Sequence, residues 1–210
     1  MAELQMRIPT PDELRTAYQR DLIEAFPPAE LKPLRYIVHM IGQGVYEPLC
    51  LYDGRELVGE CFLWFRNPGW AMLDYLSVTR TRRNGGFGAY MLRELQRRRP
   101  DDVVFVEVEA PDDAPDPPMA ARRLKFYARC GARFSGIESS IYGVHYKIIY
   151  FAAAPHDDRE IRRQYDTIYR KTLPPDQYGR YIQIPRRTAG VPFPAARTVT
   201  ERVEHENTVF

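Results

Sequence analysis

The chain has 210 residues, of which 44% are hydrophobic and 28% charged, so it is long enough for one domain with a substantial core plus an extension. The formal net charge of +2 gives no global electrostatic case for nucleic acid, and no nucleic-acid partner is expected. Arginine, with 26 residues against four lysines, suits phosphate recognition, although a bias in overall composition accounts for most of these arginines.

Cysteine use and hydropathy predict a cytoplasmic location. Three cysteines, Cys50, Cys61 and Cys130, show no metal-ligand spacing and give an odd count. The sequence shows no signal peptide and no long apolar span. We therefore expect a reduced cytoplasm, no bound metal and no membrane partner.

Hydrophobic periodicity and turn residues predict alternating strands and helices. The expected elements are a strand over residues 5–8, helices over 11–26 and 29–41, strands over 49–52, 57–65 and 72–78, a helix over 86–98, a strand over 103–110, a helix over 119–130, and strands over 134–139 and 142–151. Beyond residue 154, a charged helix over 157–171 has a thin apolar stripe, and residues 177–185 have enough apolar side chains to dock. Residues 186–210 are polar and interrupted by prolines, which predicts a flexible tail.

The most informative segment is the turn between the strand at 72–78 and the helix at 86–98. Glycines at Gly85, Gly86 and Gly88 let the backbone approach a ligand without an intervening Cβ. The first N–H groups of a helix lack partners within the helix, so they can point at a phosphate. Arg82 and Arg83 add positive charge at the same place. The segment therefore predicts a phosphate-binding turn.

The spacing of this turn narrows the choice of ligand. Residues 83–88 read R-x-x-G-x-G, which lacks the Gly-Lys-Ser/Thr ending of a Walker loop and differs from the G-x-G-x-x-G dinucleotide fingerprint. The turn resembles the R/Q-x-x-G-x-G/A motif with which the GNAT acyltransferases bind the pyrophosphate of coenzyme A. The predicted order of elements, β-α-α-β-β-β-α-β-α-β-β, is also similar to that of the GNAT family, over roughly residues 4–153.

The resemblance implies an α/β (α+β) fold with a central mixed, mostly antiparallel sheet flanked by helices. Residues 1–153 would form the acetyltransferase domain, and residues 154–185 an extension that either covers the acceptor cleft or joins the subunits of a homodimer. Acetyl-CoA is the implied cosubstrate, with no metal. The implied cofactor-binding residues are those of the strand and of the turn, namely Leu76, Ser77 and Val78, and Arg83, Asn84, Gly85, Gly86, Phe87, Gly88 and Ala89.

A second segment resembles another signature of the family. Residues 124–134 are similar to L/F-Y-x-x-x-G-F, in which the tyrosine faces the cofactor sulfur, so the resemblance implies that Tyr127 is the general acid. The alternative is that Tyr127 is a core aromatic residue of an amphipathic helix. Two positions differ from the family pattern: Ala120 stands where asparagine is common, and Ala132 where phenylalanine is usual.

Three acids are candidates for a general base. Strand alternation places Asp74 on the same face as Leu76, and Glu107 on the same face as Glu109. A carboxylate in an apolar strand has a raised pKa, which suits a base. The alternative for each acid is a charge at a strand end that faces solvent or pairs with an arginine.

These features predict an N-acetyltransferase that transfers the acetyl group of acetyl-CoA to a primary amine by direct attack in a ternary complex. The acceptor stays open between a small-molecule amine, an amino-acid-like compound and a protein N-terminus. One alternative is a non-catalytic acyl-CoA-binding sensor module. A more distant one is a nucleic-acid or ribosome-associated protein that uses the arginines around the turn.

Overall fold

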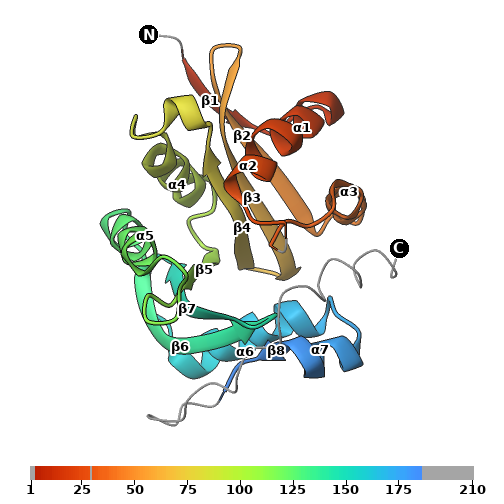
Figure 1. The fold of residues 1–210 in the computed structure, drawn as a ribbon, viewed down its shortest axis with the longest axis vertical. Helices are drawn as coiled ribbons and strands as arrows, with labels where there is room; N and C mark the ends of the chain where they lie inside the picture. Colours follow the sequence, from red (N-terminus) through yellow and green to blue (C-terminus); the bar gives the residue numbers. More distant parts are fainter. Residues whose placement is uncertain (1–2, 29, 186–210) are drawn as a thin grey trace. The chain divides into compact units, whose positions relative to one another are not determined.

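The structure is a computed structural model that describes residues 3–28 and 30–185. Its helices and strands follow the order predicted from the sequence (Figure 1). The predicted tail, residues 186–210, and the predicted first residue of the second helix, residue 29, lie outside the described residues. None of the helices within residues 3–28 and 30–185 has the length and apolar character that a membrane crossing requires.

The boundaries of the elements differ from the predicted ones by a few residues. The strands are β1 (Leu4–Arg7), β2 (Tyr46–Asp53), β3 (Glu56–Asn67), β4 (Trp70–Val78), β5 (Val103–Glu109), β6 (Arg133–Ile141), β7 (Val144–Phe151) and β8 (Ile182–Gln183). The helices are α1 (Pro11–Ala17), α2 (Ile23–Ala25), α3 (Leu34–Gly42), α4 (Phe87–Arg98), α5 (Pro117–Arg129), α6 (Asp158–Arg170) and α7 (Pro175–Tyr181), with a π-helical turn η1 (Tyr18–Leu22) and a 3-10 turn η2 (Arg80–Arg82).

Hydrogen bonds join the strands in the order β1-β2-β3-β4-β5-β7-β6-β8. The β4–β5 pair is parallel, whereas antiparallel ladders join β1 to β2, β2 to β3, β5 to β7, and β6 to both β7 and β8. This mixed, mostly antiparallel sheet with flanking helices confirms the α/β fold class predicted from the sequence.

The chain folds as two compact units. The described part of the first unit comprises residues 3–28, 30–65 and 73–99, and that of the second comprises residues 66–72 and 100–185. The domain boundaries predicted at residues 153 and 185 stay predictions.

In the first unit, helices cover both faces of β3. Gly59 and Glu60 are neighbours on this strand, so a Cβ on the first and the side chain of the second point in opposite directions. A Cβ on Gly59 would come within 2.8 Å of the methyl carbon of Met91 in α4. The Glu60 carboxyl group instead lies beside Asp21 of η1, close enough for the two groups to shift each other's pKa. Therefore α4 packs on one face of β3, and the π-helical turn packs on the other.

The helix predicted over residues 11–26 is divided by that π-helical turn. Its start agrees with the sequence, because Thr10 and Glu13 form a reciprocal capping box at the N-terminus of α1. The helical spacing of apolar residues in this segment predicts one buried stripe, formed by Leu14, Tyr18, Leu22, Ile23 and Phe26. In the structure Leu22 is fully buried but Ile23 is 53% exposed. A π-helical turn contains an extra residue, which rotates the following side chains. Asp21, which lies within this turn, is buried.

In the second unit, the segment that follows β7 packs on the sheet. The side chains of Ile161, Tyr165 and Ile168 in α6 are fully buried. The hydroxyl group of Tyr165 forms a 2.8 Å hydrogen bond with Oγ of Ser139 in β6. The short strand β8 extends the sheet by pairing with β6. The apolar stripe of this helix therefore faces the sheet of its own unit.

The substitution Ile168→Ala tests this packing. It should lower the free energy of unfolding by about 2–5 kcal/mol, because it leaves a cavity at a fully buried position. The matched control is Arg163→Ala on the exposed side of the same helix, which should change stability by no more than about 0.5 kcal/mol. Urea unfolding measures both variants, and equal stabilities would show that α6 is not packed.

Candidate functional site

The predicted phosphate-binding turn lies between β4 and α4 in the first unit. Two of its residues have left-handed backbones, Asn84 with φ of 65° and Gly86 with φ of 81°. Gly86 is the N-cap of α4, and no side chain caps this end of the helix. The first intrahelical hydrogen bond runs from the Tyr90 N–H to the Gly86 carbonyl at 2.9 Å. The N–H groups of residues 87–89 therefore lack acceptors within the helix, as an anion site requires.

The two adjacent glycines are needed for different physical reasons. A Cβ on Gly86 would meet no heavy atom within 4 Å, so its requirement is the left-handed backbone, and the space beside it is open. A Cβ on Gly85 would lie 2.9 Å from the Phe87 ring and 3.2 Å from the Arg82 carbonyl oxygen, so here the requirement is space. The turn is thus open beside Gly86 and closely packed around Gly85.

The two arginines of the turn have different partners. Arg82 forms ion pairs with Asp53 and with Glu56, the latter at 2.7 Å. Arg83 is exposed, and its Nε donates to the carbonyl oxygen of Val78 at 3.2 Å, which ties the arginine to the end of β4. Among residues 3–28 and 30–185, no carboxylate bonds to Arg83, so its charge lies free beside the turn in the described part of the chain.

Among the predicted bases, Asp74 lies in the first unit on β4. Its Oδ1 accepts a hydrogen bond from Nζ of Lys32 at 2.7 Å, and its Oδ2 accepts one from the Tyr46 hydroxyl at 2.5 Å. Burial raises the pKa of Tyr46 well above its ordinary value, and the charge of Asp74 raises it further. Tyr46 thus stays protonated and donates to a carboxylate that already has an ammonium partner.

The other two candidate bases lie in the second unit on β5. The carboxylate of Glu107 accepts hydrogen bonds from the hydroxyls of Tyr165 and Tyr169, the latter at 2.5 Å. Burial raises the pKa of both phenols well above their ordinary values, and the charge of Glu107 adds to this effect. Glu109 accepts from Arg123 of α5 at 2.9 Å, which is the arginine pairing weighed as its alternative role.

Tyr127, the predicted general acid, lies on α5 in the second unit and is half-buried. Its ring forms edge contacts with Phe126 and Phe151, with centroids 5.2 and 6.4 Å apart. Its helix ends where predicted, with Gly131 in a left-handed conformation at φ of 94°. The predicted cofactor-binding residues and Asp74 therefore belong to the first unit, and Glu107, Glu109 and Tyr127 to the second.

No protein-family model and no curated protein matches the sequence. Solved structures match its fold. A protein from Bacteroides thetaiotaomicron assigned to the GNAT family of acetyltransferases has a TM-score of 0.62 at 21% identity, over 78% of this chain and 97% of its own. The ribosomal-protein-S18-alanine N-acetyltransferase from Escherichia coli has a TM-score of 0.54 at 17% identity, over 74% and 97%. A spermidine N-acetyltransferase from Vibrio cholerae in complex with CoA and spermine has a TM-score of 0.54 at 12% identity, over 70% and 94%.

The chain has the GNAT fold. The resemblance inferred from the motif and the order of elements is thereby confirmed for the fold. The described part of this GNAT fold contains no group of three or more His, Cys, Asp or Glu side chains that could hold a metal ion.

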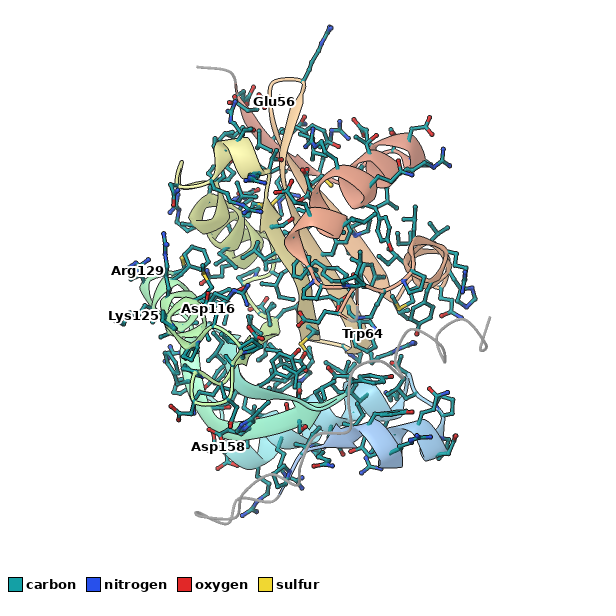
Figure 2. All side chains as sticks on the ribbon, viewed as in Figure 1. Glu56, Trp64, Asp116, Lys125, Arg129 and Asp158 are labelled. Atoms are coloured by element: carbon teal, nitrogen blue, oxygen red, sulfur yellow. The ribbon has the colours of Figure 1, made fainter. Side chains whose placement is uncertain are left out.

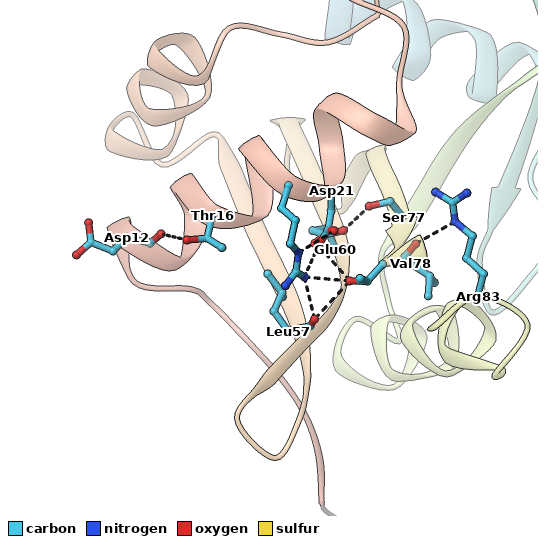
Figure 3. A network of polar contacts seen from close by, with 10 residues as sticks. Asp12, Thr16, Asp21, Leu57, Glu60, Ser77, Val78 and Arg83 are labelled. Carbon is cyan, nitrogen blue, oxygen red and sulfur yellow. Dashed lines mark hydrogen bonds and ion pairs between the residues drawn. The ribbon is translucent and has the colours of Figure 1, made fainter. Parts of the chain in front are cut away.

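A polar network that contains the buried side chains of Asp21, Glu60 and Ser77 lies at the end of β4 in this GNAT fold (Figure 3). Ser77 of β4 donates to the carboxyl group of Glu60, and Thr79 donates to Oδ2 of Asp21 at 3.1 Å. Arg20 forms a 2.6 Å ion pair with the same carboxylate and donates to the Leu57 carbonyl oxygen at 2.9 Å. The strand that enters the turn is therefore fixed to β3 and to η1.

The two carboxyl groups of this network differ in protonation. Burial raises the pKa of Glu60 to about 9, and its hydrogen bond to Asp21 raises it as well. Burial also acts to raise the pKa of Asp21, but the hydrogen bonds from Arg20 and Glu60 outweigh it, so this pKa lies below its ordinary value. At neutral pH the proton resides on Glu60 and the negative charge on Asp21, beside Arg20.

Sequence analysis missed Glu60, although a signal was present. Glu60 is the one acid inside the otherwise apolar run of residues 57–65. A central strand with an isolated acid predicts a buried carboxyl group with a raised pKa. Its distant partner Asp21 has no such local signal.

The substitution Glu60→Gln tests the protonation of this pair, because the amide keeps a donor for Asp21 but does not titrate. A carboxyl group whose pKa is raised by folding stabilises the protein fully below its unfolded pKa of about 4.5, and this contribution is lost as pH rises toward about 9. The slope is at most about 1.4 kcal/mol per pH unit. Urea unfolding across this range should show a steeper loss of stability for the wild-type protein than for the variant. Parallel curves would mean that Glu60 is ionised in the folded state.

Proposed function

We propose that the protein is an acetyl-CoA-dependent N-acetyltransferase that transfers the acetyl group to a primary amine by direct attack in a ternary complex. The observation that supports this most is the uncapped helix N-terminus of α4, opened by the left-handed Gly86 and flanked by Arg83. The GNAT fold alone does not fix a reaction, so the proposal rests on this turn and on the side chains around it.

The turn provides what a pyrophosphate requires. The N–H groups of Phe87, Gly88 and Ala89 lack intrahelical acceptors and would bond phosphate oxygens, with favourable interaction from the helix dipole. Arg83 would add a charge-assisted hydrogen bond from its exposed guanidinium group. Asn84 and Gly85 would shape the backbone around the ligand.

The rest of the cofactor would follow β4 backwards from the turn. Backbone groups of Leu76, Ser77 and Val78 would pair with the amides of pantetheine, and this direction brings the thioester toward Asp74. One of the acids Asp74, Glu107 and Glu109 would accept the proton of the attacking amine. Tyr127 would donate a proton to the leaving thiolate, since a phenol is protonated at neutral pH.

A primary amine is the proposed acceptor class because direct attack on a thioester needs an uncharged nitrogen nucleophile. The solved structures with this fold include a ribosomal-protein-S18-alanine N-acetyltransferase and a spermidine N-acetyltransferase. Both a peptide N-terminus and a small polyamine therefore belong in the panel of acceptors to be tested.

Substitution of Gly86 tests the cofactor site. Gly86→Asp should weaken CoA binding by at least about tenfold, because it adds a negative charge where a phosphate would bind. The left-handed backbone strains any side chain at residue 86, but aspartate adopts such backbones more readily than most residues, and the fold of the variant is checked by circular dichroism. The matched control is Gly86→Asn, which has the same shape without the charge and should weaken binding less. Calorimetry measures CoA affinity in each variant.

The same proteins test catalysis by release of thiol from acetyl-CoA with a panel of amines. The wild-type protein should release thiol with at least one amine, and Gly86→Asp should not. Tight CoA binding without any release would favour the non-catalytic sensor module. Equal CoA affinity in the wild-type protein and in Gly86→Asp would remove the basis of the proposal.

Tyr127→Phe tests the general acid, because it keeps the ring and deletes the hydroxyl group. We expect kcat to fall by about 10²–10⁴ while CoA affinity is nearly unchanged, which is the usual effect of losing a general acid. Thiol-release assays measure kcat, and calorimetry measures CoA affinity. A kcat within about threefold of the wild-type value would assign the proton to another group or to water, because less than about 1 kcal/mol of barrier would be involved.

A further inference from the structure

Lys32 differs from the other three lysines of the chain in its surroundings. It is 9% exposed, and it lies in the loop between α2 and α3. Lys125 and Lys171 are exposed, and Lys147 is half-buried beside Glu138. Figure 2 shows Lys125 on the outer side of α5. A buried lysine needs a specific partner for its charge, and Lys32 has one.

The Lys32 ammonium group is enclosed by a carboxylate and two aromatic rings of the first unit. Its Nζ lies 2.7 Å from Oδ1 of Asp74, with side chains that are 11% and 9% exposed respectively. The same nitrogen lies 4.9 Å from the ring centroid of Trp64 and 5.6 Å from that of Tyr75, both within cation–π range. This arrangement of acid and aromatic faces is what an amine ligand would require.

The backbone around Lys32 is fixed to the same strand. The Lys32 N–H donates to the Tyr75 hydroxyl at 2.7 Å, and this hydroxyl donates to the Glu30 carbonyl oxygen at 3.0 Å. Tyr75 is the neighbour of Asp74 on β4. The loop is thus attached to β4 through its backbone as well as through its side chain, and the amine is held in one position.

We infer that Lys32 is a self-acetylation site: its amine accepts the acetyl group of acetyl-CoA bound to the same chain. This inference rests on the proposed function, which directs the thioester arm along β4 from the turn toward Asp74. Asp74 precedes Val78 by four residues, which is roughly 13 Å along a strand. The chain therefore holds a primary amine against the carboxylate toward which the acyl end of the cofactor points.

The reaction balances without any further reactant. The Lys32 ammonium group gives a proton to the Asp74 carboxylate, and the neutral Nζ attacks the thioester carbonyl carbon. The C–N bond of an amide forms, the C–S bond breaks, and the CoA thiolate leaves and takes up a proton. The products are Nε-acetyl-lysine and free CoA, with one net proton released to solvent.

Acetylation changes the charge at this position. The amide product has no positive charge, so Asp74 loses its ion-pair partner and keeps the hydrogen bond from Tyr46. A cationic amine from solution would then find a carboxylate without a cationic partner, so self-acetylation would prepare the chain for an acceptor.

Mass spectrometry of the purified protein incubated with acetyl-CoA tests the inference. Lys32 should gain an acetyl group at least about tenfold faster than Lys125 or Lys171, although it is less exposed, because a held amine reacts at a high effective concentration. The three other lysines are internal controls, since non-enzymatic acetylation favours exposed amines. Acetylation of the exposed lysines in preference to Lys32 would overturn the inference.

Two variants distinguish the need for bound acetyl-CoA from the need for the Lys32 amine. Gly86→Asp should reduce Lys32 acetylation to the rate of the other lysines, and Lys32→Arg should remove the modification while leaving that of Lys125, Lys147 and Lys171 unchanged. The rate should not depend on protein concentration, because donor and acceptor belong to one chain. A wild-type rate in Gly86→Asp would overturn the inference.

The outcome also separates the two proposals. If the protein binds CoA and releases thiol with added amines but leaves Lys32 unmodified, self-acetylation is wrong and the proposed function stands. If CoA does not bind at all, both are wrong. Asp74→Asn tests the proton acceptor, and unchanged acetylation of Lys32 in this variant would overturn the role given to Asp74.

Discussion

The strand end that leads into the candidate cofactor site bonds to two buried carboxyl groups, of which one keeps its proton. Glu60 keeps it and Asp21 remains charged, so the interior under the end of β4 contains one negative charge, and Arg20 balances it. Two ionised carboxylates in contact would repel each other in a medium of low dielectric constant. Ser77 and Thr79, which bond to this pair, are the residues on either side of Val78, where the turn begins.

The other acids on the strands also have donors bonded to their carboxylates. Asp74 pairs with an ammonium group, Glu107 accepts hydrogen bonds from two phenols, and Glu109 pairs with a guanidinium group. These partners differ in what they permit. A phenol or a guanidinium group stays protonated in the physiological range, whereas the lysine amine is a nucleophile once its proton is removed. The three candidate bases therefore differ in whether their partner could itself act as a nucleophile.

The sequence predicts the fold and the turn because both depend on local patterns. The apolar strand, the glycines at residues 85 and 86 and the amphipathic helix are contiguous, so their periodicity and backbone requirements are visible in one segment. The capping box at Thr10 and the helix end at Gly131 are local in the same way. The left-handed Asn84 adds to this group, since asparagine is common in such positions.

The partners of the acids could not be predicted, since the two members of each pair lie far apart in the sequence. Lys32 is separated from Asp74 by 42 residues and Tyr165 from Glu107 by 58. No local pattern specifies which lysine or tyrosine reaches which carboxylate. The π-helical turn has no periodic signal either, because the apolar spacing around it fits an ordinary α-helix, and this is why Ile23 was assigned to the buried stripe.

The two phenols on Glu107 have a consequence for how this protein could have arisen. They come from α6, which follows β7 in the chain, yet they bond an acid on β5. Losing the helix alone would leave the acid without its donors, and losing the acid alone would leave Tyr169 buried without that acceptor. The helix and the acid are thus expected to be inherited together, as a single character in the history of the protein.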